Sequence, residues 1–239
     1  MENKGKGITV FKHKWLTDYF KDKYKGVILK HLSNEKGLRF LSIGSNVFIN
    51  DDFYKLTVSN NWHGVCVDGN PLTSEKFLML TKSVMDKITF VFSYVVPPRF
   101  ATTQKLLIDE THHGDATLIQ ARRKEFDDVM NIWVKCMSTT ELVDIIGTDF
   151  KALSIDTEGL DIKILKALPN QLFKNLNHVL VETVDETLVS YLHNFGLKYK
   201  YYVEDTKFGQ YFYFTRQPIS QKLINEYKEE HKLRNNSLH

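Results

Sequence analysis

Three carboxylates crowd one short stretch of the chain, where an expected strand gives way to an expected helix. The apolar run at 152–155 is long enough for a buried strand and too short for a helix. Asp156, Glu158 and Asp161 follow it within six positions. In open α/β sheets, ligands bind at the carboxyl ends of the strands, so these acids stand where acid–base chemistry would be placed.

The three acids differ in how easily a purely structural role explains them. Glu158 has such a role, because the macrodipole favours negative charge at the start of any helix. Asp161 falls inside the apolar arc of the helix that Leu160, Ile164 and Leu168 define, where a solvated charge is not expected. We therefore interpret Asp156 and Asp161 together as the signal of a site.

A second group of candidate residues follows the first expected strand, at 39–43. Gly44-Ser45-Asn46 forms a small-residue turn directly after it. A strand that runs into such a turn is typical of cofactor-binding openings in Rossmann-like folds, since glycine lets the backbone approach a ligand. The turn predicts a cofactor subsite.

The next expected strand, at 64–68, ends in Asp68 and is followed by Gly69 and Asn70. An acid at the end of the second strand can accept hydrogen bonds from both ribose hydroxyls of a nucleoside cofactor. A plain D-G-N-P turn is the competing interpretation.

Further elements complete a pattern of alternating strands and helices. We expect a helix at 72–84 and strands at 88–93, 129–136 and 178–182, the last ending in Glu182. Ser138 and Glu141 have the spacing of a capping box. Aromatic-rich runs at 197–203 and 210–215 predict a terminal hairpin. Residues 95–128 give no clear pattern, and we interpret His112-His113 within them as part of a surface loop.

The segment IDTEGLDIKILKAL at 155–168 resembles the signature of the FkbM-type methyltransferases, which are S-adenosylmethionine-dependent enzymes, mostly O-methyltransferases of sugars and natural products. Other landmarks of that family have counterparts in order: Gly44-Ser45-Asn46 for D-x-G-A-N-x-G, Asp68-Gly69-Asn70-Pro71 for E-P-N-P, the segment 139–143 for T-L-D-E-L, and Glu182. The first landmark departs from the family, with Ser42 for its acid and Phe48 for its last glycine.

The resemblance covers about 38–216 and implies an α/β, Rossmann-like class I methyltransferase fold. Such a fold has a seven-stranded, mostly parallel sheet with an antiparallel C-terminal hairpin and helices on both faces. We expect three parts: an N-terminal helical cap at 1–36, with a pair of helices across 8–32, the methyltransferase domain at 37–217, and a charged helix and tail at 218–239.

The resemblance also implies roles for the candidate residues. S-adenosyl-L-methionine is the expected cofactor, bound by Gly44, Ser45, Asn46, Asp68, Gly69, Asn70, Ser93 and Asp156. Asp156 is placed to act as a base or to hold the cofactor ammonium, and Glu182 ends a neighbouring strand. Lys163 can supply a cation, although we expect it to be solvated. We assign no metal ligand, but two facing acids can instead bind a divalent metal, and the sequence leaves both mechanisms open.

The expected activity is O-methylation of a hydroxyl on a carbohydrate or small molecule. An NAD-dependent oxidoreductase is disfavoured, because no G-x-G-x-x-G follows the first strand. A binding module that has lost catalysis stays open because of Ser42 and Phe48, and binding of S-adenosylhomocysteine would separate it from an enzyme. An RNA ribose 2′-O-methyltransferase also stays open, and it would show a salt-sensitive affinity for RNA.

Charge and hydrophobic composition limit the kinds of binding partner and the cellular location that we expect. The net charge is only +3 with acids and bases interspersed, which argues against nucleic acid. No apolar run approaches the roughly 20 residues of a membrane span, and the first residues lack a signal peptide's apolar core. Cys66 and Cys136 lie in apolar runs and are expected to be buried free thiols, so we expect a cytoplasmic protein. Nothing in the sequence indicates an oligomeric state.

Overall fold

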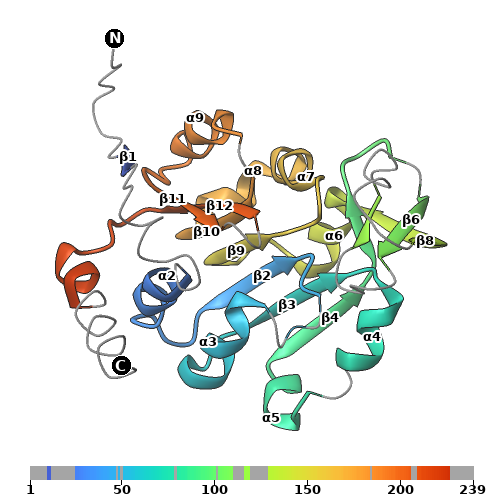
Figure 1. Cartoon of the computed structure of the whole chain (residues 1–239), viewed down its shortest axis with the longest axis horizontal. Helices are drawn as coiled ribbons and strands as arrows, with labels where there is room; N and C mark the ends of the chain where they lie inside the picture. The colour runs from blue at the N-terminus through green and yellow to red at the C-terminus, as the bar shows by residue number, and fades with distance from the viewer. Residues whose placement is uncertain are drawn as a thin grey trace, which may run out of the picture.

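A large, mostly parallel sheet forms the centre of the molecule (Figure 1). The structure is a computed structural model, and it describes residues 10–11, 25–46, 48, 51–77, 80–100, 102–109, 116–118, 129–183, 185–205 and 209–226. In spatial order the strands are β1 (Val10–Phe11), β11 (Tyr199–Asp205), β12 (Gly209–Thr215), β10 (His178–Glu182), β9 (Ala152–Ile155), β2 (Arg39–Ile43), β3 (His63–Asp68) and β4 (Ile88–Phe92).

The strand order confirms the expected fold class. Among the described strands of this sheet, β12 alone runs antiparallel to its neighbours, β10 and β11. The seven strands from β11 to β4 are therefore the predicted mostly parallel sheet with an antiparallel C-terminal hairpin. The short β1 is added at the edge, parallel to β11. The sequence predicted a helix across Val10–Phe11, and that prediction was wrong, since this segment pairs with the open edge of the sheet.

Helices cover both faces of the sheet. One face carries α2 (Lys25–Leu32), α3 (Asp52–Asn60), α4 (Pro71–Phe77) and α5 (Lys82–Met85), together with a helix at 221–226. The other face carries α6 (Thr139–Ile146), α7 (Asp161–Ala167), α8 (Asn170–Asn175) and α9 (Thr187–His193). The expected single helix at 72–84 is two short ones, and the helix after Asp156 begins only at Asp161.

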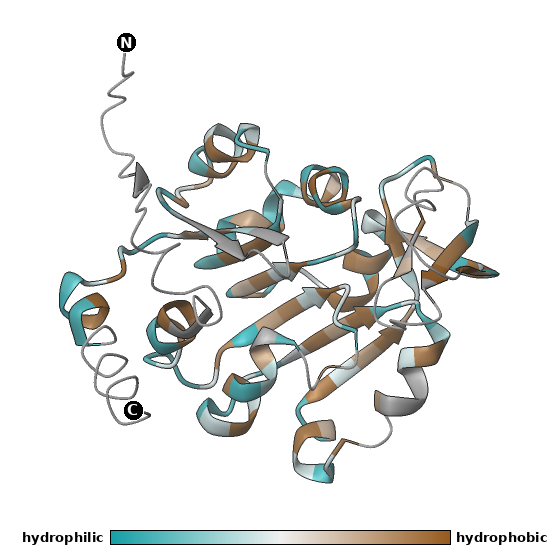
Figure 2. Ribbon diagram, in the orientation of Figure 1, coloured by the Kyte–Doolittle hydropathy of each residue, from teal (hydrophilic) through white to brown (hydrophobic). Residues whose placement is uncertain are grey.

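Alternate residues of the central strands feed two separate cores. Leu41 and Leu153 pack with the helices of the second face, whereas Phe40 and Ala152 pack with those of the first. Because both faces are covered, these strands are apolar at nearly every position, as Figure 2 shows. No helix in the described part of the chain is long and apolar enough to cross a bilayer.

A second, smaller sheet is inserted between β4 and α6. It consists of β5 (Tyr94–Val96), β8 (Val129–Ser138), β6 (Thr103–Asp109) and β7 (Ala116–Thr117), in that spatial order. Figure 1 shows it beyond the arrowheads of β2 and β3. The sequence did not predict β6, because Leu106, Leu107 and Ile108 are all buried and break the alternation of a half-exposed strand. His112 and His113 lie outside the described residues.

The end of β8 starts α6 as the sequence predicted. The Ser138 side chain accepts from the backbone N–H of Glu141, and the Glu141 carboxylate accepts from the backbone N–H of Ser138. This capping box fixes the direction of α6 as it leaves the small sheet.

Both cysteines are buried free thiols, which confirms that prediction. Cys66 lies on β3 and Cys136 on β8. Burial raises the pKa of Cys66 well above its ordinary value and that of Cys136 to about 11, so both stay protonated near neutral pH.

A buried polar network joins the amino end of β10 to the segment after α2. The ring of His178, which begins β10, pairs through Nδ1 with the Tyr213 hydroxyl at 2.8 Å and through Nε2 with the Glu35 carboxylate. His31 of α2 lies beside both rings, 5.8 Å from His178 and 6.2 Å from Tyr213 between ring centroids. The network thus ties the N-terminal region to the sheet.

Candidate functional site

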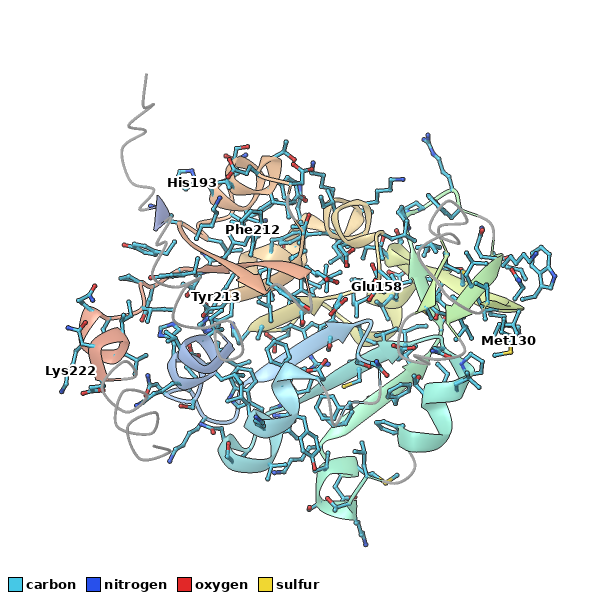
Figure 3. All side chains as sticks on the ribbon, viewed as in Figure 1. Met130, Glu158, His193, Phe212, Tyr213 and Lys222 are labelled. Atoms are coloured by element: carbon cyan, nitrogen blue, oxygen red, sulfur yellow. The ribbon has the colours of Figure 1, made fainter. Side chains whose placement is uncertain are left out.

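Three carboxylates meet at the carboxyl ends of two neighbouring parallel strands. Ile155 of β9 is in register with Val181 of β10, so Asp156 and Glu182 follow their strands side by side. Their carboxyl groups are hydrogen-bonded to each other. Glu158 adds a third, and one oxygen from each of the three lies within 4.8 Å of the others. Figure 3 shows Glu158 close to the tip of β2.

The electrostatics of this carboxylate cluster, Asp156, Glu158 and Glu182, favour retention of a proton. Burial raises the pKa of Asp156 well above its ordinary value, and the hydrogen bond to Glu182 and the negative charges around it raise it further. A carboxylate with a raised pKa is a stronger base near neutral pH. The same oxygens are ligands that divalent cations prefer, so the cluster can hold either a shared proton or a cation.

One neutral donor also faces the cluster. The hydroxyl of Tyr211, which pairs with Glu182 across β10 and β12, lies 3.5 Å from Oδ2 of Asp156. Tyr211 is buried, so its ring forms part of the wall behind the acids.

Asp161 lies beside the candidate site that it helped to predict, but it is not a member of the carboxylate cluster. Its carboxylate accepts from the backbone N–H of Thr157 at 2.6 Å, from the Thr157 hydroxyl at 3.1 Å and from the N–H of Gly159 at 3.0 Å. Asp161 is buried because it closes the turn that carries Glu158, which has a left-handed φ of 55°. Its role is to hold the loop that presents the other acids.

The turn after β2 contacts Asp156 of the carboxylate cluster through Gly44. Gly44 has a φ of 79°, and a Cβ at this position would lie 1.7 Å from the Asp156 carbonyl oxygen. No other residue fits there without moving one strand end away from the other. The N–H groups of Gly44 and Ser45 both donate to the Val67 carbonyl, at 2.8 and 3.2 Å, which anchors the turn on β3.

The two expected cofactor segments meet at Asp68. Its oxygens accept from the backbone N–H of Asn46 and of Asn70, each at 2.8 Å. Burial raises the pKa of Asp68, and these backbone donors oppose the rise. The Thr73 hydroxyl is a third donor, 3.4 Å from the Oδ1 that Asn70 also bonds. Because each carboxylate oxygen has two lone pairs, Oδ2 keeps acceptor capacity for a further donor such as a ribose hydroxyl.

The remaining residues of this turn support its shape. A Cβ on Gly69 would lie 2.1 Å from the Tyr94 ring, so the chain passes directly over that ring. The Asn70 side chain accepts from the N–H of Leu72 at 3.0 Å and starts α4. Ser93 is buried, and its hydroxyl donates to the Tyr94 carbonyl at 3.3 Å.

Ser45 is the described residue whose buried side chain lacks a hydrogen-bond partner. Its hydroxyl is fully enclosed within the turn between β2 and α3. The enclosed hydroxyl lies beside the buried Cys66 thiol and is not open to a ligand.

The two departures from the family landmark have local explanations. The Ser42 hydroxyl donates to the carboxylate of Asp51, which caps α3 by accepting from the N–H of Phe53 at 2.7 Å. An acid is therefore present at this position in space, although it comes from nine residues further along the chain. Phe48 is fully buried and stacks on Phe40 with centroids 5.8 Å apart, so it serves the core.

Lys163 lies on the exposed side of α7, as expected, and makes no hydrogen bond or ion pair to any described residue. Sequence reasoning missed Asp51, Tyr211 and the membership of Glu158 in the cluster. Only Glu158 had a local signal, its position two residues after Asp156. The other two depend on contacts between distant elements.

Comparisons with known proteins find distant structural similarities. No protein-family model matches the chain, and no curated protein matches it. Solved structures that resemble it include the precorrin-6y C5,15-methyltransferase of Geobacter metallireducens GS-15, with 13% identity, a TM-score of 0.45, and coverage of 88% of this chain and 95% of that one. The methyltransferase FkbM of Methylobacillus flagellatus KT has 9% identity and a TM-score of 0.48 over 74% of this chain and 43% of that one. Aeropyrum pernix fibrillarin, solved with S-adenosyl-L-methionine, has 10% identity and a TM-score of 0.43 over 80% of this chain and 74% of that one.

Proposed function

We propose that the chain is an S-adenosylmethionine-dependent methyltransferase that transfers a methyl group to a hydroxyl. The observation that carries the proposal is the meeting of two features at one edge of the sheet. The hydrogen-bonded pair Asp156 and Glu182 lies there, and Gly44, in contact with Asp156, begins the turn that ends on Asp68.

The residues present fit the cofactor. Oδ2 of Asp68 has acceptor capacity for a ribose hydroxyl, and Gly44 lets the turn after β2 lie directly against Asp156. The carboxyl group of Asp156 is a further polar group for the amino-acid part of such a ligand. When bound, S-adenosylmethionine supplies a methyl group that its sulfonium already activates.

The protein's own contribution is alignment and removal of one proton. An alcohol is a poor nucleophile near neutral pH, so a base positioned beside it accelerates its attack. Asp156 is the proposed base, because burial and its acidic neighbours raise its pKa. A hydrogen bond between Asp156 and Glu182 needs a proton on one of the two carboxyl groups, so the carboxylate oxygens that remain unprotonated are the ones that accept the proton of the hydroxyl.

We also propose a carbohydrate or small-molecule hydroxyl as the acceptor and the cytoplasm as the compartment. A carbohydrate or small-molecule hydroxyl follows from the resemblance of 155–168 to the FkbM-type signature. A cytoplasmic location follows from two buried cysteines that stay as thiols.

Calorimetric titration with S-adenosylhomocysteine tests the cofactor site. We expect micromolar binding by the wild-type chain that is lost in Asp68→Ala, because the ribose acceptor disappears with the carboxylate. Asp149→Ala, at an exposed position at the amino end of β9, is the matched control and should bind like the wild type. Absence of binding to the wild type would instead favour a methyltransferase-like scaffold that has lost catalysis.

The metal-assisted alternative predicts a different result at the same residues. If the carboxylate cluster holds a divalent cation, Mg²⁺ should raise the melting temperature of the wild type but not of Glu158→Gln, which removes one of three ligands. If the cluster holds a proton, Mg²⁺ should leave both melting temperatures unchanged.

A further inference from the structure

The small sheet exposes an aromatic ring between two lysines. Trp133 of β8 is 73% exposed, the largest exposed fraction among the apolar side chains described. It pairs directly with Lys105 of β6, and the next residue on the same face of β8, Lys135, pairs with Thr103. All four side chains are exposed and share one face, because residues that pair across antiparallel strands point to the same side.

Spacing places the cations within reach of a ligand that covers the ring. Cβ atoms of directly opposed residues lie about 5 Å apart, and same-face neighbours along a strand about 7 Å apart. Lysine side chains are long enough to span both distances. The described exposed side chains of this face between 103 and 105 and between 131 and 135 include no acid.

We call the surface formed by Lys105, Trp133 and Lys135 the aromatic–basic face.

We propose that the aromatic–basic face binds single-stranded nucleic acid. A base can stack on Trp133 irrespective of its identity, and the neighbouring phosphates can approach Lys105 and Lys135. This combination of an aromatic platform with flanking cations is what sequence-tolerant single-strand binding requires.

Charge decides against the two competing occupants. In a symmetric contact with a second copy, each surface meets itself, so the lysines of one copy would face those of the other. A neutral sugar can stack on Trp133, but it would make no use of the two flanking charges. A strand of nucleic acid satisfies both the ring and the cations.

The test is fluorescence anisotropy with a fluorescein-labelled single-stranded oligouridylate of about 12 nucleotides, within the usual range of site sizes. We expect saturable binding at about 50 mM salt that weakens steeply by about 200 mM. Trp133→Ala should weaken binding about 5- to 150-fold, whereas Trp133→Phe, which keeps a stacking surface, should lose much less. Because Trp133 is exposed, melting temperatures should match the wild type.

The charge contribution has its own variants. Lys105→Gln with Lys135→Gln should reduce the slope of log affinity against log salt by about 1.4, since each single-strand phosphate contact contributes about 0.7. Lys82→Gln with Lys151→Gln removes two exposed lysines from α5 and from the amino end of β9, and should leave the slope unchanged.

Three results would overturn the proposal: no binding at low salt, binding that Trp133→Ala does not weaken, or a slope that changes equally in both lysine pairs. A wild-type dimer that Trp133→Ala dissociates would assign the face to a second copy instead. The proposal does not rest on methyl transfer. Titration with S-adenosylhomocysteine tests the residues around Asp68, which are not part of the aromatic–basic face, so the two experiments can succeed or fail independently.

Discussion

The two ends of one strand, β10, carry opposite kinds of polar cluster. At its amino end, His178 has a partner on each ring nitrogen, Tyr213 and Glu35. At its carboxyl end, Glu182 is hydrogen-bonded to Asp156 within a group of like charges. The first cluster pairs a potential cation with an acid, and the second contains acids alone.

The five residues of β10 thus connect a cluster suited to stability with a cluster suited to function. Buried polar groups that satisfy one another cost little and fix one arrangement of the chain. Carboxyl groups forced together cost free energy, and such arrangements persist where chemistry needs a shifted pKa. We therefore expect the amino-end network to set stability and the carboxylate cluster to set activity, and each prediction below tests that division.

The largest expected effect is on catalysis. Asp156→Asn keeps the shape of the side chain but removes the base, so methyl transfer should fall about 10²- to 10⁴-fold. The free energy of unfolding should stay the same or rise by about 1 kcal/mol, because a like charge is lost. Single-turnover assays with radiolabelled cofactor and urea melts measure the two quantities on the same preparation. A lower free energy of unfolding in Asp156→Asn would contradict the expectation that the carboxylate cluster does not contribute to stability.

The largest effect on stability is expected from His178→Ala. Removal of the buried ring leaves Glu35 and Tyr213 without their partner, which should cost about 2–4 kcal/mol of unfolding free energy. Affinity for S-adenosylhomocysteine, measured well below the melting temperature, should be unchanged. His63→Ala, at an exposed position at the start of β3, is the control for loss of a histidine.

The two clusters should respond to acid in opposite directions. Burial, and then the nearby His178, lower the pKa of His31 to about 4, so stability from its neutral form is lost as the pH falls from 6.5 towards 4. The pKa of Asp156 is raised, so its unfavourable contribution is relieved over the same fall in pH, as the carboxyl group takes up a proton.

Melting temperatures between pH 7 and pH 4 separate these two contributions. His31→Gln should flatten the decline of stability with falling pH, and Asp156→Asn should steepen it because the compensating gain is gone. Identical profiles for the wild type and both variants would show that neither group governs the acid response.

The smallest effects come from a matched pair of tyrosines on β12. Tyr213 hydrogen-bonds His178 at 2.8 Å, whereas the Tyr211 hydroxyl approaches Asp156 only at 3.5 Å. Tyr213→Phe should therefore lower the unfolding free energy by about 1–2 kcal/mol with no loss of activity. Tyr211→Phe should change stability by less than about 0.5 kcal/mol and affect only the rate. The opposite result, with Tyr213→Phe affecting the rate and Tyr211→Phe the stability, would contradict the assignment of stability to the amino-end network and of activity to the carboxylate cluster.

The seven strands from β11 to β4 were predictable from sequence because each is a short apolar run between turn residues, whereas β1 was not predicted. The positions of Asp68, Asp156 and Glu182 followed from the same runs, since each acid ends one. The small sheet was not predictable, because Leu106, Leu107 and Ile108 are buried on both sides and lack the alternation that signals a strand.

The roles of individual acids were harder to predict than their positions. Asp161 was part of the signal of a site because it lies on a buried helix face, but the sequence did not show that three hydrogen-bond donors from the adjacent turn occupy its carboxylate. Asp51 gave no signal, because its contact with Ser42 exists only after the chain has folded back over β2. Both omissions arise from hydrogen bonds, which sequence patterns record far less well than burial.

The two buried thiols can report on the rate at which each sheet unfolds locally. Alkylating reagents attack the thiolate, and neither Cys66 nor Cys136 offers one to solvent while the sheet is intact. Because Cys66 belongs to a central strand and Cys136 to the inserted sheet, mass spectrometry of each modified peptide would time the opening of each sheet separately.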